Sequence, residues 1–588
     1  MVKSAGFHQD SIPLKDVEAG NVHYELPGRS QADKKLLSKD GGTSNDSSDN
    51  SRDKWGRKAE YVLSMIGYCV GLGNVWRFPY VCIRNGGGAF LIPFFICLTL
   101  CGLPLYLMEV AMAQFVGLGP FHVWSICPMF KGIGIAMNSA SFFLSWYYSM
   151  ILAWSLIYLV NSFRSPLPWT QCGQSWNTAN CRTPHEMKTG LNGNTTLQEL
   201  ASNLTEYSLT SRNGTPSLDT LPQNVPDLMV SDSYNSTYSL ENDTLLNSVA
   251  SSVGNTSVSS SEEFWINNVL HLSSGLSEFG TIPWESGVAL VVQAVIVYLC
   301  VIKGVSSVGK VVYVTATLPY ILLTVLLIKG ATLPGALDGV IFYLKPDFSK
   351  LVRVQTWVEA SLQVFYSLGP AWGGLITMAS YNKFNNNCLR DSVLLSFACE
   401  GSSVFAGFAI FTMLGHMAHT LRVPISTFAN TGPGLVFVVY PEAISYLPLP
   451  QLWGVLFFIM LFTLGLDTQF VMCETLLTTL GDLFPGLMRK RQALIKLLYF
   501  AALLLISLPF ATEGGMYLFQ LVDWYFAAYA VIVNGILELV VVGWIYGAER
   551  FFDDIKLMLG RRPPRLFIIV WRFITPILLL VSHQISTS

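Results

Sequence analysis

The residues most able to bind small ions lie in two segments that are otherwise apolar. Residues 66–80 read IGYCVGLGNVWRFPY, so glycines, an asparagine and an arginine interrupt a stretch long enough to cross a membrane. Residues 464–468 read LGLDT and place Asp467 beside Thr468. Main-chain carbonyls, carboxylates and hydroxyls are the hard oxygen ligands that small cations require. These residue types predict cation sites within the apolar part of the chain.

A third segment, residues 363–374, repeats the pattern of the first and reads QVFYSLGPAWGG. A helix broken inside a membrane survives only where its freed amides and carbonyls line a protein cavity. Breaks at corresponding places in two halves of a chain indicate an inverted repeat with a binding site at the midplane. A glycine-rich helix-packing face is the alternative for the first segment. Asn74 and Arg77 argue against that alternative, because polar groups are costly inside a membrane.

The composition places these segments in a polytopic membrane protein. Of the 588 residues, 51% are hydrophobic and 13% are charged, and the mean hydropathy is +0.45. A soluble chain of this kind would expose very large apolar patches, so the lipid bilayer is an expected partner and nucleic acid is not. A window of about 20 residues predicts eleven spans, at residues 59–83, 88–113, 134–162, 286–303, 310–333, 357–381, 392–414, 452–480, 493–511, 517–547 and 566–581.

The distribution of basic residues predicts the orientation of the spans. Lys and Arg residues lie in alternate connections, beginning with Arg52, Lys54, Arg57 and Lys58. The positive-inside rule therefore places the N-terminus in the cytoplasm. Residues 1–57 lack the apolar region of a signal peptide and are expected to form a disordered cytoplasmic tail. Residues 58–163 would hold the first three spans, residues 164–285 an extracellular loop, and residues 286–588 the remaining spans.

The long loop carries signals of an extracellular surface. Cys172 and Cys181 flank Trp176 at its start, and on the oxidising side of a membrane they predict a disulfide. The other nine cysteines lie in or beside apolar spans and are expected to be packing residues. Six N-x-S/T sequons predict glycosylation, at Asn194, Asn203, Asn213, Asn235, Asn242 and Asn255.

Taken together, these segments resemble the neurotransmitter:sodium symporter family, which shares the fold of the bacterial leucine transporter. The resemblance rests on the first-span motif, on SLGPAWGG at 367–374, on ASYNKF at 379–384 and on LGLDT at 464–468. It extends from about Arg52 to the last residue, most of the long loop excepted, and it is strongest to the glycine transporters, through Tyr68 and residues 366–387. It implies an all-α, plasma-membrane protein with a 5+5 inverted repeat, broken first and sixth helices, and a twelfth span that this sequence lacks.

The resemblance also implies two sodium sites. The second site would use the carbonyls of Gly67, Val70 and Leu464 with the side chains of Asp467 and Thr468. The first site would use the carbonyl of Cys69 with the side chains of Asn74 and Ser367.

A small amino-acid substrate is implied beside these ions. Its carboxylate would meet the amides of Leu72 and Gly73 at a helix N-terminus, which favours an anion, and the hydroxyl of Tyr148. The other substrate contacts would come from Tyr68, Leu144, Tyr366, Gly369, Trp372, Thr468 and Met472. Two charged pairs would act as gates: Arg77 with Asp523 outside, and Arg52 with Asp482 inside. Without the resemblance, Arg52 and Asp482 read as solvated surface charges.

Two departures from the family pattern concern chloride. Phe94 lies where the family carries a chloride-binding Tyr, and Cys399, followed by Glu400, lies where it carries an Asn. The chloride residues that remain are Gln363, Ser367 and Ser403. We therefore expect weak or absent chloride dependence, with the Glu400 carboxylate supplying the negative charge. The alternative is that Glu400 has no role at an ion site and faces water or another protein.

Three functions stay open from the sequence. Gly71 lies where the monoamine members of the family carry an Asp, so a sodium-coupled symporter of glycine or another small neutral amino acid is favoured over a monoamine carrier. A symporter of broader amino-acid range and a non-transporting receptor or interaction protein on the same fold are the alternatives. The sequence shows no catalytic constellation, so an enzyme is not expected. The oligomeric state stays open, a homo-oligomer included.

Overall fold

The computed structural model describes residues 54–183, 186, 258–427, 434–523, 525 and 530–587. Several sequence predictions lie outside these residues. They are the tail up to residue 53 with Arg52, and the sequons at Asn194, Asn203, Asn213, Asn235, Asn242 and Asn255.

The first span is broken within the segment where the sequence predicted a break. It consists of α2 (Lys58–Cys69) and α3 (Leu72–Arg84), separated by Val70 and Gly71. The backbone leaves the helical region at Val70 (φ −90°, ψ 78°) and is extended at Gly71 (φ −102°, ψ −166°). The last carbonyls of α2 and the first amides of α3 therefore lack their usual partners within a helix.

The sixth span is also broken, into α16 (Val354–Leu368) and α17 (Gly374–Ala379). Between these helices the backbone is left-handed at Gly369 (φ 65°), Ala371 (φ 66°) and Gly373 (φ 86°). Glycine adopts this conformation without steric cost, whereas alanine does not. Ala371 is held there by a hydrogen bond from its amide to the Glu109 carboxylate at 2.5 Å.

The other predicted spans correspond to long helices or to runs of shorter ones. The second span consists of η1 (Gly87–Phe90), α4 (Leu91–Cys97), η2 (Leu98–Gly102) and α5 (Leu103–Val116), and the third, fourth and fifth of α7 (Lys131–Asn161), α12 (Trp284–Val301) and α13 (Val305–Thr315) with α14 (Leu318–Ala331). The seventh, eighth and ninth are α18 (Cys388–Leu421), α20 (Pro450–Leu483) and α21 (Pro485–Ser507) with η10 (Leu508–Ala511). The tenth contains α22 (Gly515–Val522), α23 (Val531–Val540) and η12 (Val541–Ile545), and the eleventh contains α25 (Leu566–Ile569), η13 (Val570–Ile574) and α26 (Thr575–Thr587).

Eight uninterrupted segments of the described residues are long and apolar enough to cross a membrane. A ninth is obtained if Val531–Ile545 and α24 (Ala548–Leu559), which meet at 90°, count as one span. The two broken spans are additional to these. Eleven spans and the inverted repeat remain predictions.

Short elements cover the two ends of the helical body. The connections include α6 (Pro120–Val123), η3 (Trp124–Ile126), η4 (Pro128–Phe130), η5 (Pro168–Thr170), α11 (Ser260–Glu263), η6 (Phe264–Val269), α15 (Ala336–Leu344), η7 (Phe348–Val352), η8 (Ile425–Thr427), η9 (Leu435–Val439) and α19 (Tyr440–Ser445). Strands β1 (Cys181–Arg182) and β2 (Val258–Ser259) pair in parallel, with Cys181 opposite Val258. The predicted disulfide between Cys172 and Cys181 is confirmed, and the other nine cysteines are free.

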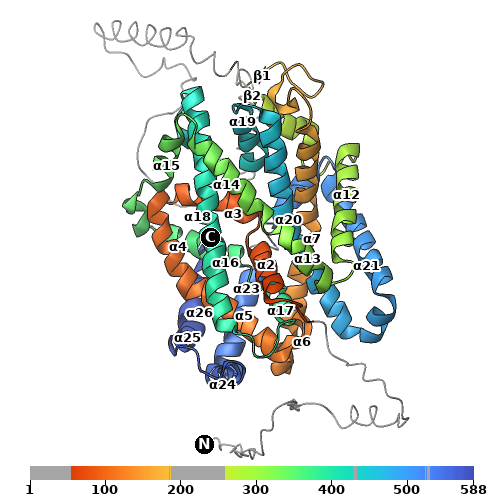
Figure 1. Ribbon diagram of the computed structural model, residues 1–588, viewed down its shortest axis with the longest axis vertical. Helices are drawn as coiled ribbons and strands as arrows, with labels where there is room; N and C mark the ends of the chain where they lie inside the picture. Colours follow the sequence, from red (N-terminus) through yellow and green to blue (C-terminus); the bar gives the residue numbers. More distant parts are fainter. Residues whose placement is uncertain are drawn as a thin grey trace, which may run out of the picture. The chain divides into compact units, whose positions relative to one another are not determined.

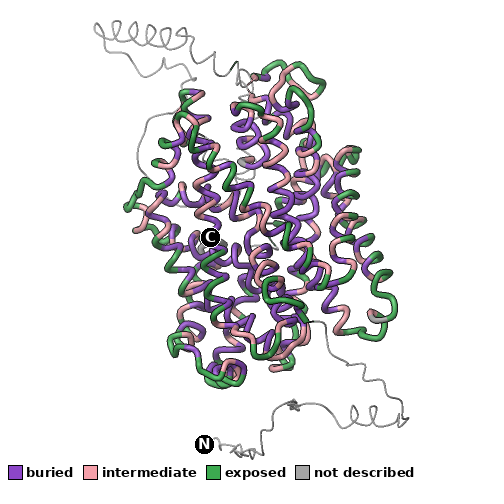
Figure 2. Tube along the Cα trace, in the orientation of Figure 1, coloured by how far each residue is buried: buried purple, intermediate pink, exposed green. Residues whose placement is uncertain are grey.

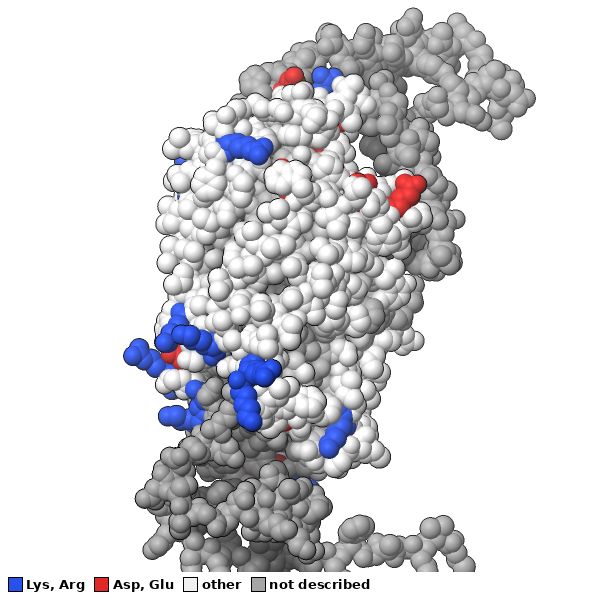
Figure 3. Space-filling model, turned by 90° about the vertical axis from the view of Figure 1, so that its right-hand side faces the viewer, with Lys and Arg blue, Asp and Glu red and all other residues white. Residues whose placement is uncertain are grey.

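The helices surround a buried centre that contains both breaks. Helices α7 and α20 pack along each other, and α15 packs on α18 (Figure 1). Burial is highest toward the interior of the bundle, and exposed residues follow its outer faces (Figure 2). Many of those exposed residues are apolar, including Leu299, Ile321 and Leu505. Figure 3 shows one face with an uncharged middle and most of its Lys and Arg side chains toward one end, which is the surface expected of a protein embedded in lipid.

The contact between α15 and α18 gives a first prediction. A Cβ at Gly339 would lie 1.9 Å from the Phe411 carbonyl oxygen and 3.0 Å from the Gly415 Cα. Gly339→Ala should therefore force the helices apart and destabilise the protein by about 1–3 kcal/mol. The measurement is the temperature at which the detergent-solubilised protein stops eluting as a single species. The control is Gly401→Ala in α18, where a Cβ meets nothing within 4 Å; equal losses in both variants would contradict the prediction.

Candidate ion and substrate site

Asp467 lies within α20 with its carboxylate against the backbone of α2. A Cβ at Gly67 would lie 2.4 Å from Asp467 Oδ2, so this approach requires glycine. The Thr315 hydroxyl of α13 donates a hydrogen bond to Asp467 Oδ1 at 2.5 Å. Asp467 is 2% exposed, and none of the ion pairs between described residues includes it. A buried carboxylate without a cationic side chain is costly, so the arrangement favours a bound cation.

The remaining residues predicted around Asp467 lie on the same two helices. The Thr468 hydroxyl donates to the Tyr68 carbonyl at 3.4 Å, and Leu464 lies one helical turn before Thr468. Val70 closes the C-terminal end of α2, where the helix dipole favours positive charge. No group of three or more His, Cys, Asp and Glu side chains among the described residues is placed to hold a metal. One carboxylate with backbone oxygens suits a monovalent cation better than a divalent one. We call this the Asp467 site.

A second polar cluster joins α3, α16 and α18. The Asn74 Nδ2 donates to Ser367 Oγ at 2.9 Å and to Ser403 Oγ at 2.8 Å. Its Oδ1 accepts from the Gly71 amide at 3.3 Å, which fixes the start of α3. The structure therefore brings together the side chains predicted for the first sodium site and one predicted for chloride. We call this the Asn74 site.

Glu400 belongs to the Asn74 site. It is fully buried, and the hydroxyls of Ser367 and Ser403 lie at its carboxylate. These contacts fall short of good hydrogen-bond geometry, and both carboxylate oxygens have no other partner among the described residues. Gln363, one turn before Ser367 on α16, also carries a buried Oε1 without a partner there. The alternative that Glu400 faces water is therefore wrong.

Phe94 is part of an apolar cluster. Its ring lies 4.8 Å from that of Phe78 and 5.9 Å from that of Phe90, centroid to centroid. It is fully buried, and it offers no hydroxyl to an ion. The carboxyl group that lies at Ser367 and Ser403 is that of Glu400.

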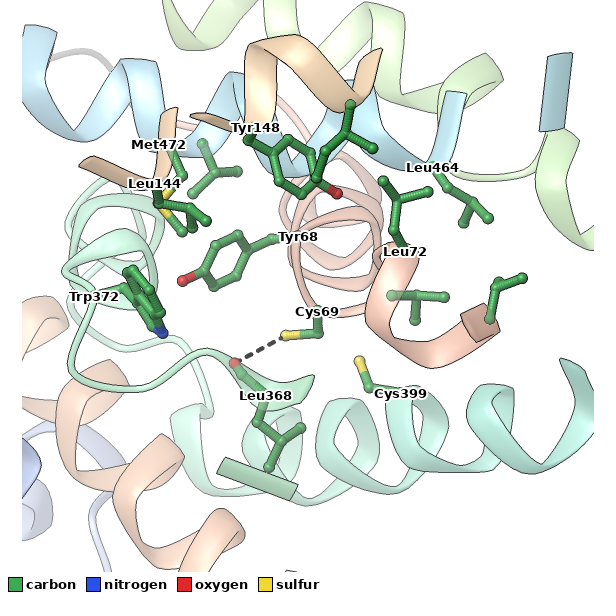
Figure 4. Packing of buried hydrophobic residues seen from close by; sticks show 14 of the residues in the cluster. Tyr68, Cys69, Leu72, Leu144, Tyr148, Leu368, Trp372, Cys399, Leu464 and Met472 are labelled. Carbon is green, nitrogen blue, oxygen red and sulfur yellow. Dashed lines mark hydrogen bonds between the residues drawn. The ribbon is translucent and has the colours of Figure 1, made fainter. Parts of the chain in front are cut away.

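The start of α3 provides groups for an anion. The hydroxyl of Tyr148 on α7 lies beside the Leu72 amide and the Thr468 hydroxyl, but neither contact has good hydrogen-bond geometry. Figure 4 shows this hydroxyl turned toward Leu72. A Cβ at Gly71 would lie 3.0 Å from Thr468 Oγ1 and 3.6 Å from the Tyr148 hydroxyl. Gly71 therefore keeps open the space between these groups and the helix N-terminus.

Large side chains fill the other side of this region. The Tyr68 hydroxyl donates to the Gly369 carbonyl at 2.9 Å, which ties the two breaks together. Trp372 follows Gly369 in the second break, and its indole lies beyond the hydroxyl end of Tyr68, near Leu144 and Met472 (Figure 4). Trp372 is 5% exposed, and Ser141 of α7 donates to its carbonyl. Of the predicted substrate residues, Gly369 and Thr468 thus contact Tyr68, and Leu144, Trp372 and Met472 lie on the side of its hydroxyl (Figure 4).

The two residues predicted for the outer gate, Arg77 and Asp523, form no ion pair among the described residues. The Arg77 guanidinium lies 4.7 Å from the centroid of the Tyr366 ring, a cation–π contact. The Tyr147 hydroxyl lies at the Asp523 carboxylate, and Arg77 is near enough to attract it. Of the inner pair, Asp482 accepts from the Gly119 amide at 2.8 Å, whereas Arg52 lies outside the described residues.

Several residues of the site were missed by sequence reasoning. Thr315 carries no local signal, because a threonine in an apolar span is common. Glu109 and Glu538, whose carboxyl groups face each other from α5 and α23, were detectable as charges within apolar stretches. The Trp55 indole donates to the Met378 carbonyl at 2.9 Å, and the Trp55 amide donates to the Tyr381 carbonyl at 3.2 Å.

Comparison with known proteins agrees with this geometry. The model of the sodium:neurotransmitter symporter family matches residues 52–212 and 217–587. The chain is 42% identical over 530 residues to the sodium- and chloride-dependent glycine transporter 2 of Xenopus laevis, covering 90% of this chain and 63% of that protein. It is 42% identical over 529 residues to the sodium- and chloride-dependent creatine transporter 1 of Mus musculus and of Homo sapiens, covering 90% of this chain and 75% of each.

By class, the chain is thus a polytopic membrane protein of a transporter family. It belongs to the sodium:neurotransmitter symporter family.

The Asp467 site gives a second prediction. Thr315→Val removes a hydrogen bond to a buried carboxylate, which is worth about 1.5–3 kcal/mol. We expect sodium affinity to fall by about tenfold or more, measured as the sodium concentration that half-maximally raises the melting temperature of the purified protein. Thr324→Val is the matched control, because the Thr324 hydroxyl donates only to the Tyr320 carbonyl of its own helix. An unchanged sodium midpoint in Thr315→Val would show that this hydroxyl does not support the site.

Proposed function

We propose that this protein carries glycine or another small neutral amino acid into the cell together with sodium, by alternating access across the plasma membrane. The single observation that carries the proposal is the meeting of both helix breaks around Tyr68. There, the Leu72 amide of α3 and the Tyr148 hydroxyl lie beside Thr468, and the carboxylate of the preceding residue, Asp467, lies against Gly67. A zwitterionic substrate and a cation can be bound side by side only where anion-binding and cation-binding groups adjoin in this way.

The Asp467 site would be the main sodium site. The carbonyls of Gly67, Val70 and Leu464 and the Thr468 hydroxyl would complete the oxygen ligands there. The Asn74 site would take a second sodium ion through the Cys69 carbonyl, Asn74 and Ser367, with the substrate carboxylate as a further ligand. Cys399 replaces an amide of the family pattern at this site, and a thiol is a poor ligand for a hard cation. We therefore assign the stronger sodium dependence to the Asp467 site.

The substrate would be small. Its carboxylate would accept from the Leu72 and Gly73 amides and the Tyr148 hydroxyl. Trp372, Leu144 and Met472 would occupy the space where a longer side chain would lie. Gly71 leaves no carboxylate for an amine that has none of its own, which disfavours monoamines. Creatine is the second candidate, because creatine transporters match the chain as well as a glycine transporter does and creatine also carries one carboxylate.

Orientation and location follow from the same proposal. The Cys172–Cys181 disulfide and the sequons of the long loop support an extracellular side for residues 164–285. The N-terminus would then lie in the cytoplasm, and Arg77 with Asp523 would close the outer side of the pathway. A receptor or interaction protein on the same fold would bind substrate at this site without carrying it across the membrane.

Uptake measurements provide the third prediction. Cells expressing the chain should accumulate labelled glycine in sodium and not in choline, while leucine should compete poorly. Trp372→Leu should improve competition by leucine by about tenfold, because removal of the indole relieves steric overlap. Preferential uptake of labelled creatine would assign the second candidate instead. Equal transport of leucine and glycine by the unmodified chain would contradict the pocket argument, and binding without accumulation would indicate a receptor.

Chloride replacement provides the fourth prediction. If the Glu400 carboxylate supplies the negative charge at the Asn74 site, uptake should change less than about twofold when gluconate replaces chloride. Glu400→Gln keeps the shape and removes the charge, so its uptake should become chloride-dependent. The matched control is Glu549→Gln, which removes an exposed carboxylate of α24. A steep chloride requirement in the unmodified chain would mean that Gln363, Ser367 and Ser403 suffice for chloride and that Glu400 has no such role.

A further inference from the structure

Two free thiols from different helices meet at the Asn74 site. Cys69 is the last residue of α2, and Cys399 lies on α18. Their exposed fractions are 2% and 0%, and the two thiols lie close enough to interact (Figure 4). The Cys69 thiol also donates to the Leu368 carbonyl at 3.4 Å. Figure 4 shows the sulfur of Cys399 facing Cys69 and Leu368.

This pair differs from the other free cysteines that the structure describes. The Cys82 thiol donates to the Gly87 carbonyl at 3.2 Å, a packing contact within one region of the chain. Cys97 and Cys101 lie one helical turn apart on a continuous segment, so a bond between them would tie no two helices together. Cys69 and Cys399 connect segments that are 330 positions apart in the sequence. A covalent bond here would therefore constrain the fold rather than one helix.

Because Cys69 lies at a helix break, a disulfide between Cys69 and Cys399 would restrict the movement of α2. Cys69 immediately precedes the break in the first span, and Leu368 is the last residue before the break in the sixth. A disulfide would fix the C-terminal end of α2 to α18 and remove the hydrogen bond from Cys69 to Leu368. In alternating access, helices around a binding site must move relative to each other. A fixed end of α2 would oppose that movement.

We propose that Cys69 and Cys399 form a reversible oxidation site, and that a disulfide between them arrests the protein. The part of this proposal that concerns transport rests on the proposed function, whereas the bond itself does not. The oxidant is a small peroxide. One thiol attacks hydrogen peroxide, the O–O bond breaks, and a sulfenic acid and one water are formed. The second thiol attacks the sulfenic sulfur, which forms the S–S bond and releases a second water. Two small thiols, such as glutathione, restore the pair and leave as one disulfide.

Access to the pair would follow the ion pathway. Both thiols are buried in the described structure, and buried thiols react slowly. The adjoining site must open to one side of the membrane when ions and substrate enter or leave. Peroxide would reach Cys69 and Cys399 in that open state, so saturating sodium and substrate, which hold the site closed, should slow the oxidation.

The first experiment detects the bond without any transport assay. The purified full chain is treated with hydrogen peroxide, its remaining thiols are blocked after denaturation, and its peptides are analysed by mass spectrometry. We expect a linked peptide containing Cys69 and Cys399, which dithiothreitol removes and which is absent from Cys399→Ala and from Cys69→Ser. Oxidation of these cysteines only to sulfinic or sulfonic acid, or linkage to other cysteines, would overturn the proposal. So would their survival as free thiols when Cys127 is oxidised.

The second experiment measures the consequence in cells. Peroxide should lower sodium-dependent uptake of the carried substrate at least fivefold, and dithiothreitol should restore it. Cys399→Ala and Cys69→Ser should resist peroxide, whereas the control Cys82→Ala should remain as sensitive as the unmodified chain. A linked peptide with unchanged uptake would overturn the arrest. A chain that shows no uptake before peroxide would contradict the proposed function, and the linked peptide would still decide whether the pair oxidises.

Discussion

The buried carboxylate of Asp467 is the constraint on which the centre of this protein depends. It lies against Gly67, where any larger residue would collide with it, and Thr315 is the hydrogen-bond donor that reaches it. A charged carboxylate is costly in such a place unless it is paired, and no cationic side chain among the described residues pairs with it. The end of α2 offers carbonyls in place of a side chain, because the helix stops there. The break in the first span and the buried acid therefore adjoin each other: carbonyls without helical partners lie beside a carboxyl group that has no cationic side chain.

The break in the sixth span is also held by a buried carboxyl group. Ala371 adopts a left-handed backbone conformation that alanine disfavours and is held by Glu109 through its amide. Tyr68 then joins the two breaks through the Gly369 carbonyl, while Asn74 joins α3 to α16 and α18 through Ser367 and Ser403. Polar side chains thus replace the missing helical hydrogen bonds at each interruption. Tyr68 is also one of the residues predicted to contact the substrate, so one side chain would serve both the stability of the breaks and recognition of the ligand.

The local sequence was sufficient to predict where the helices break. It was insufficient to predict which side chains from other helices contact each break. Glycine, proline and asparagine within apolar segments predicted the interruptions near Gly71 and Gly369, because these residues act on their own backbone. The contacts of Asp467 with Thr315, of Cys69 with Cys399, and of Glu400 with two serines join residues from separate helices, so they depend on how the helices pack. Helix α15 was not predicted either, since nine residues are too few to be found by a window the length of a membrane span. The roles of the site residues came from the family resemblance rather than from the residues themselves.

Trp55, just before α2, has a mechanical consequence. Its indole and its amide donate to the carbonyls of Met378 and Tyr381, at the end of the sixth span. Lys58, at the start of α2, pairs with Asp391 of α18 at 2.8 Å. The start of the first span and the end of the sixth are therefore joined by hydrogen bonds, at the end of the molecule opposite the disulfide. If the start of α2 moves away from α17, the hydrogen bonds of Trp55 must break first. If these hydrogen bonds persist, α2 and α17 must move together. The contacts of one tryptophan thus couple any movement of α2 to that of α17.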